Sequence, residues 1–208
     1  DAELNQQIAR GRLSLDSGPQ ELELSRDRFT VAQEAVSSGQ ASLAGLAQPI
    51  DAALAHYNAV AQSKLSLLND YSAKLARLAQ HFSVLRVAGI SLLSAPSVNA
   101  SEELRKNVMS ILREATAYGI QSSPTNGGYI DELGQEIVAA EEGLANDAER
   151  GAVRHLLNTV DSLRSAADQL QVLTEEFDAV PSGPALYDLR TAYEKHFYNL
   201  QSTARSYR

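Results

Sequence analysis

The 208-residue chain contains no cysteine. This absence excludes disulfide bonds, thiolate nucleophiles and zinc sites built on cysteine. A chain without cysteine is also compatible with an oxidising compartment. Glycine and proline are scarce, with 12 and 6 residues, which excludes collagen-like and low-complexity sequences. Hydrophobic residues make up 44% of the chain, which is enough for a packed core in one or two domains.

Long apolar runs and clustered basic residues are lacking too. The longest apolar stretch, near residues 87–93, is far shorter than the roughly 20 residues that span a bilayer. Because 18 Lys+Arg are scattered among 26 Asp+Glu, giving a net charge of −8, we expect no nucleic-acid partner. No signal-peptide pattern opens the chain. Helical patterns reach both ends, so we interpret the sequence as a segment of a longer protein.

Helical periodicity dominates the sequence. A seam of mostly apolar residues three and four apart runs from Leu54 to Leu92, between Pro49 and Pro96. It predicts a helix of roughly 45 residues, about 70 Å long. A second long seam runs over residues 129–179. Its two halves are out of phase, which predicts a break, kink or stutter at 145–151.

Shorter helices account for the rest of the chain. One carries Leu4, Ile8, Gly11 and Leu15, and the next begins near Pro19. Another follows Pro96 with Ser101 as its cap, and the last has an apolar stripe that begins at Leu186 and includes the following residues: Leu189, Tyr193, Phe197, Leu200, Ala204 and Tyr207. The strongest loop signals are SSPTNGG at 122–128 and PSGP at 181–184.

No stretch shows the alternation of a β-strand, so the predicted fold class is all-α. Short connections favour an elongated antiparallel helical bundle. Two helices too long for one bundle further predict two stacked helical modules that share the long helices. We expect residues 1–208 to form one region built of these two modules.

Motifs for catalysis, metal binding and cofactor binding are not found. The sequence has no phosphate-binding loop, nucleophile elbow, dinucleotide fingerprint or zinc-protease motif. Its four histidines are not spaced three or four residues from one another, and none follows a Glu at three residues. We interpret Glu132, Glu136 and Glu141 as a solvated acidic face. We therefore expect no catalytic residue, no metal and no cofactor.

The candidates for binding are polar residues on or beside the long seam, together with Tyr118, which lies next to the loop at 122–128. Asn58 and Ser72 replace apolar residues in the seam, either to fix helix register or to line a pocket between helices. Arg86 lies in an otherwise apolar run, where it could hold a carboxylate through two hydrogen bonds or extend to water over its own methylenes. The candidate ligand-binding residues are Tyr57, Asn58, Tyr71, His81, Arg86 and Tyr118.

Two segments carry a resemblance to a known family. The first helix has Leu4-Asn5, Arg10 and Leu13 before a break at Asp16–Pro19, and the middle of the long helix has Lys64, Leu67, Tyr71, Ala76 and Leu78. In these features the chain resembles the double all-helical ligand-binding (DAHL) sensor domains of bacterial membrane histidine kinases. It departs from their pattern at three places: Leu15, the inserted Ser17-Gly18, and Gln80-His81. Helical bimodular chemoreceptor domains look similar at this level.

The resemblance implies an extracytoplasmic sensor domain, periplasmic and anchored in the inner membrane only through flanking segments. It also implies a homodimer in the full receptor and an output domain elsewhere. The ligand would be a small molecule or a periplasmic binding protein, and a helix shift would carry the signal. The alternatives are a structural or adaptor bundle that packs on partner helices, and an enzyme or cofactor carrier.

Overall fold

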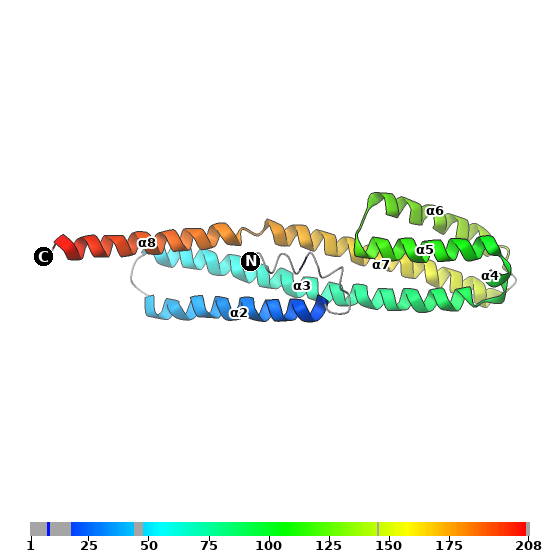
Figure 1. The fold of residues 1–208 in the computed structure, drawn as a ribbon, viewed down its shortest axis with the longest axis horizontal. Helices are drawn as coiled ribbons and strands as arrows, with labels where there is room; N and C mark the ends of the chain where they lie inside the picture. Colours follow the sequence, from blue (N-terminus) through cyan, green and yellow to red (C-terminus); the bar gives the residue numbers. More distant parts are fainter. Residues whose placement is uncertain (1–7, 9–17, 44–47, 145, 207–208) are drawn as a thin grey trace. The chain divides into compact units, whose positions relative to one another are not determined.

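The computed structural model describes residues 8, 18–43, 48–144 and 146–206, and in these residues it contains helices and no strand (Figure 1). The predicted all-α fold class is therefore confirmed. The helices are α2 (Gly18–Leu43), α3 (Gln48–Leu93), α4 (Pro96–Ala100), α5 (Glu102–Ile120), α6 (Pro124–Glu141), α7 (Asp147–Ala179) and α8 (Ser182–Ser206). None of the described helices is long and apolar enough to cross a membrane.

The chain divides into two compact units. Unit 1 comprises Asp1–Arg10, Ser17–Ser72 and Leu173–Arg208, and unit 2 comprises Gly11–Asp16 and Ala73–Val172. Helices α3 and α7 each contribute residues to both units. The elongated, stacked arrangement of two modules stays a prediction.

The core of unit 2 comes from the apolar stripes of α3, α5, α6 and α7. On α5, Leu104, Val108 and Ile111 are buried, as are Ala115 and Tyr118. Ser101 caps this helix as expected, because its side chain accepts a hydrogen bond from the Leu104 backbone nitrogen. The facing stripes contribute these buried residues: Leu75, Leu78, Leu85, Leu92, Ile130, Leu133, Ile137, Val153, Leu156, Val160, Leu163, Ala167 and Leu170.

The interpretation of residues 129–179 as a single long element is wrong. Helix α6 ends at Glu141, α7 begins at Asp147, and the two run in opposite directions (Figure 1). The break predicted near 145–151 is therefore a reversal of the chain around Gly143. Only α7, with 33 residues, continues the second seam.

The loop predicted at 122–128 is shorter than expected. Only residues 121–123 are non-helical, because Pro124 occupies the first turn of α6, where its missing N–H costs nothing. Gly127 then lies buried inside the helix. The acidic-face interpretation also needs one correction. Glu132 and Glu136 are exposed, but Glu141 is buried and lies 2.7 Å from Arg154.

Unit 1 is built from α2, α8 and the adjoining parts of α3 and α7. The described residue of the first predicted helix, Ile8, is helical and buried, whereas Leu4, Gly11 and Leu15 lie outside the described residues. As predicted, Pro19 lies in the first turn of α2. The interior of unit 1 includes Leu22, Leu54, Ala61, Leu68, Tyr71, Phe177 and Ala185.

The apolar stripe of α8 does not belong to this core. The side chains of Leu186, Tyr193, Phe197 and Leu200 are 47%, 47%, 52% and 53% exposed. The half-buried side chains of α8, such as Leu189 and His196, lie on a neighbouring face of the helix. The sequence pattern was therefore read correctly as an amphipathic helix, but the structure leaves its most apolar face in solvent.

Candidate functional site

The six predicted ligand-binding residues fall into both units. Unit 1 contains Tyr57, Asn58 and Tyr71, and unit 2 contains His81, Arg86 and Tyr118. Each unit therefore has to be considered as a separate place for a ligand.

In unit 1, Tyr71 is a packing residue. Its side chain is 1% exposed, and its hydroxyl donates a hydrogen bond of 2.9 Å to the backbone oxygen of Ile8. Tyr57 and Asn58 are half-buried, and the amide oxygen of Asn58 is buried with no hydrogen-bond partner among the described residues. None of these three residues lines any of the four grooves described among residues 74–169, all of which belong to unit 2.

The sequence did not single out Lys64 as a binding residue, yet it is the buried cation of unit 1. The residue is 2% exposed, and its ammonium lies 4.6 Å from the centre of the Phe177 ring. Burial lowers the pKa of Lys64 below its usual value, and the nearby Asp178 carboxylate partly opposes this shift. The contacts of Lys64 join α3 to α7 inside unit 1.

In unit 2, Tyr118 joins three helices. Its hydroxyl on α5 donates a 2.7 Å hydrogen bond to Asp168 on α7. The guanidinium of Arg164, also on α7, lies 5.6 Å from the ring centre and pairs with Asp131 on α6. Burial, followed by the hydrogen bond and the charge of Asp168, raises the pKa of Tyr118. Since these groups satisfy one another, the arrangement is typical of a structural contact between helices.

His81 lines a polar groove between α3 and α7 of about 440 Å³. Lys74 and Arg77 contribute to the same wall, and Asp161 and Gln169 face them from α7. The Lys74 ammonium already donates a hydrogen bond to Gln169. Arg77, His81 and Asp161 have no hydrogen bond or ion pair among the described residues, but the lining carries charges of both signs and, unlike that of the groove described next, is mainly polar.

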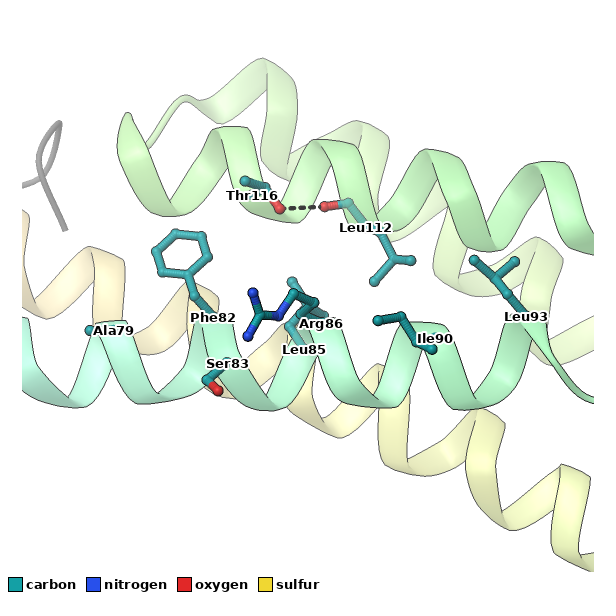
Figure 2. A pocket seen from close by; sticks show the side chains of 9 residues that line it. All are labelled: Ala79, Phe82, Ser83, Leu85, Arg86, Ile90, Leu93, Leu112 and Thr116. Atoms are coloured by element: carbon teal, nitrogen blue, oxygen red, sulfur yellow. Dashed lines mark hydrogen bonds between the residues drawn. The ribbon is translucent and has the colours of Figure 1, made fainter. Parts of the chain in front are cut away.

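Arg86 lies in a different setting, a groove of about 620 Å³ between α3 and α5 (Figure 2). The lining is mainly apolar, and it contains one charged side chain, that of Arg86. The residues that line the groove are Ala79, Phe82, Ser83, Leu85, Arg86, Ile90, Leu93, Leu112 and Thr116. Its volume lies within the range of roughly 300–1,000 Å³ of small-molecule sites.

The two helices approach each other closely because each contributes a glycine. A Cβ atom on Gly89 of α3 would lie 2.6 Å from Cδ1 of Leu112. A Cβ atom on Gly119 of α5 would overlap with Cζ of Phe82 and lie 3.0 Å from Leu163. Leu112 and Phe82, which line the groove, therefore pack over glycines of the opposite helix. These two contacts lie seven residues apart on each helix and set the width of the groove.

Arg86 has unused bonding capacity. It is exposed, and it makes no hydrogen bond or ion pair with the residues that the structure describes. Four other arginines of the same unit, Arg113, Arg150, Arg154 and Arg164, each pair with a carboxylate, whereas Arg77 and Arg105, like Arg86, have no such pair among the described residues. Figure 2 shows the Arg86 guanidinium extending along α3 on the side of Phe82, with Ile90 and Leu112 on its other side. The groove thus combines an unpaired cation with an apolar wall.

Sequence reasoning found Arg86 but not the other groove residues, namely Phe82, Ile90, Leu112 and Thr116. Phe82 had been assigned to the core seam, and it is half-buried. The available signal was the seven-residue spacing from Phe82 to Gly89 and from Leu112 to Gly119, which becomes meaningful only once α3 and α5 are known to pack antiparallel. Within the described residues no group of His, Asp and Glu side chains is arranged to hold a metal ion.

Comparison with known proteins gives one match. Neither the curated proteins nor the solved structures contain a protein that matches this chain. The family model described as the DAHL domain matches residues 1–208, which is the whole sequence. The predicted resemblance is confirmed, and the chain belongs to the DAHL family of sensor domains.

Proposed function

We propose that this chain is the extracytoplasmic input domain of a transmembrane signalling receptor, of the sensor histidine kinase class. In this proposal the domain is periplasmic and belongs to an inner-membrane protein, and it has no catalytic activity of its own. It binds a small molecule or a periplasmic binding protein. The observation that carries the ligand-binding part is the α3–α5 groove of unit 2, with its apolar wall and the unpaired Arg86.

Helix α3 is the element that would carry the signal. It is continuous from Gln48 to Leu93 and contributes residues to both units. Its groove face packs on α5 through contacts at Gly89 and Gly119, and packed interfaces of this kind favour discrete alternatives over gradual deformation. A ligand that prefers one packing of α3 against α5 would shift the population towards that packing.

The exposed stripe of α8 supports a homodimer in the full receptor. Leu186, Tyr193, Phe197 and Leu200 follow one another at steps of seven, four and three residues, which is the spacing of a coiled-coil seam. A monomer would keep this row of large apolar side chains in water. In the proposed dimer the stripe packs against α8 of a second copy.

Ligand binding is tested by thermal unfolding of the 208-residue chain against a library of small metabolites. A ligand at 100 times its Kd stabilises the folded state by about 2.7 kcal/mol, which is a readily measured rise in Tm. We expect at least one chemical class to raise Tm and to perturb backbone resonances of α3 and α5. If no compound raises Tm, and periplasmic extract yields no partner, the sensor proposal is contradicted.

The dimer is tested with single cysteines, which report cleanly because the natural chain has none. Leu200→Cys places a thiol on the stripe, and Ser202→Cys places one about 160° further round the same helix. We expect oxidation to cross-link the Leu200→Cys variant into covalent dimers and to leave the Ser202→Cys variant without a cross-link, as read on a denaturing gel. Equal cross-linking of both variants, or none of either, would contradict a dimer through this stripe.

The same stripe favours one alternative function, an adaptor bundle that packs on helices of another protein. Under this alternative the purified chain stays monomeric at high concentration, and no metabolite raises its Tm. The cross-linking and thermal-unfolding experiments together therefore separate the two functions.

A further inference from the structure

We propose that the α3–α5 groove binds a small organic monocarboxylate with a compact apolar group. The guanidinium of Arg86 would hold the carboxylate, and Phe82, Ile90 and Leu112 would cover the apolar group. This inference rests on the proposed function, because it names the class of ligand that the sensor would detect.

The sign of the ligand's charge follows from the lining. Arg86 is the only charged side chain among the nine residues of the groove, and it has no partner among the described residues. An arginine stays protonated at every physiological pH, and its planar fork matches the two oxygens of a carboxylate. An anion would therefore gain a charge-assisted pair without having to displace an existing one.

The number of charges on the ligand follows from what the groove lacks. Apart from Arg86, its polar side chains are Ser83 and Thr116, and the Thr116 hydroxyl already donates a 2.7 Å hydrogen bond to the Leu112 backbone oxygen (Figure 2). A second carboxylate would lie against apolar side chains with no cation to pair with, which is costly. A phosphate dianion would likewise have one of its two negative charges unpaired, because Arg86 is the one cation in the lining. A monocarboxylate fits this lining better than either.

The apolar part of the ligand follows from the rest of the wall. Ile90 is 61% exposed in a position where it lines the groove, so an apolar group seated there would remove it from water. Leu85, Leu93 and Leu112 extend the same surface. The binding free energy from this contact grows with the area covered, so a carboxylate without an apolar group would bind more weakly.

The size of the ligand is limited by the two glycine contacts. Leu112 packs over Gly89, and Phe82 packs over Gly119. The two contacts are seven residues apart on α3, which is about 10 Å along the helix. A group of the size of a phenyl ring fits between them, whereas a long acyl chain would extend beyond the groove.

The test adds four probe compounds, one at a time, to the unmodified 208-residue chain. Calorimetry measures each affinity, and backbone NMR shifts locate the binding site. Phenylacetate carries both features, phenylacetamide lacks the charge, acetate lacks the apolar group, and succinate carries a second charge. We expect phenylacetate to bind at least tenfold more tightly than each of the other three. The shifted resonances should belong to residues of α3 and α5 around Arg86.

The variant Arg86→Gln should weaken phenylacetate binding at least tenfold and leave phenylacetamide binding unchanged. The matched control is Arg113→Gln, an exposed arginine of α5 outside the lining, which should leave both affinities unchanged. Because Arg86 is exposed, the variant should fold, and the comparison of phenylacetate with phenylacetamide does not depend on any variant.

Three results would overturn the proposal: equal affinities for phenylacetate and phenylacetamide, equal affinities with and without Arg86, or shifts elsewhere in the chain. Absence of phenylacetate binding at millimolar concentration would overturn it as well. If the metabolite library contains a ligand of another class, each of these results would leave the proposed sensor function standing. The sensor function would be contradicted only if neither that library nor the periplasmic extract yields a ligand or partner.

Discussion

The two units differ in how their helices are held. In unit 2, polar contacts run between helices, from Tyr118 on α5 to Asp168 on α7, and from Arg164 on α7 to Asp131 on α6. In unit 1, the ion pair described on α8 is local, because it joins Arg190 to Glu194 one turn further along the same helix. In the interior of unit 1, Lys64 of α3 contacts the Phe177 ring of α7.

This difference indicates two kinds of surface. Unit 2 has polar contacts between its helices and a mainly apolar groove with an unpaired arginine, which suits a small ligand. Unit 1 leaves one row of large apolar side chains on α8 uncovered, which suits another helix. Sensing and association would thus be assigned to different parts of one chain.

The sharpest test of this comparison is a matched pair of leucine truncations. Leu163 of unit 2 is 0% exposed, and Leu163→Ala should lower the free energy of unfolding by about 2–5 kcal/mol because it leaves a cavity. Leu200 of unit 1 is 53% exposed, and Leu200→Ala should cost less than about 0.5 kcal/mol in dilute solution. Urea unfolding followed by circular dichroism measures both. A large, concentration-independent cost for Leu200→Ala would mean that the stripe is packed within the monomer.

A pair of glycine substitutions tests the close contact that shapes the groove. Gly119→Ala should destabilise the protein by about 1–3 kcal/mol, because the added methyl overlaps with Phe82. Gly151→Ala should stabilise it by about 0.5–1 kcal/mol, because no atom lies within 4 Å of the new methyl and alanine favours the helix. Thermal unfolding distinguishes the signs. If both substitutions stabilise the protein, α3 and α5 do not pack as closely as described.

The smallest effect is expected from alkaline pH, with opposite signs in the two units. The folded pKa of Lys64 is lowered from 10.5, because burial disfavours its charged form. The free energy of unfolding should therefore rise as pH increases from the folded pKa towards 10.5, where the folded protein no longer has to bury that charge. The folded pKa of Tyr118 is raised from 10.0, so the stability it contributes is complete below pH 10.0 and is lost as pH rises through the folded pKa.

The variants Lys64→Met and Tyr118→Phe separate these two contributions. Unfolding free energies between about pH 8 and pH 11 should rise less with pH in Lys64→Met than in the natural protein, and fall less in Tyr118→Phe. Effects of alkali on other groups are common to all three proteins and cancel in the differences. Identical pH profiles for the three proteins would contradict both assignments.

Sequence reasoning succeeded where a pattern depends on neighbours along the chain. The span of α3 between Pro49 and Pro96 and the cap at Ser101 follow from local periodicity and capping chemistry, and both were predicted. Reasoning failed at residues 129–179, where two seams out of phase were taken for one interrupted element. It failed again at 124–128, because proline and glycines that usually mark a loop were incorporated into α6.

The candidate site was predicted only in part for the same reason. Arg86 stood out as a charge in an apolar run, Tyr71 as a polar residue beside the long seam, and Tyr118 as a tyrosine next to the loop predicted at 122–128. The structure uses the two tyrosines for packing contacts, through Ile8 and Asp168, and leaves Arg86 unpaired. Whether a polar side chain already has a partner depends on which helices meet, and periodicity carries no information about that.

The order and type of the helices, the lengths of most of them and the apolar face of each were determined by the sequence alone, because a helix is stabilised by residues three and four apart. The tertiary structure decided which apolar faces are covered. It buried the stripes of α5 and α7, left that of α8 in solvent, and formed a groove where Leu112 and Phe82 pack over glycines of the opposite helix. Burial depends on close packing between residues distant in the chain. The pattern of an amphipathic helix shows which face can be buried, but it does not specify which other helix covers that face.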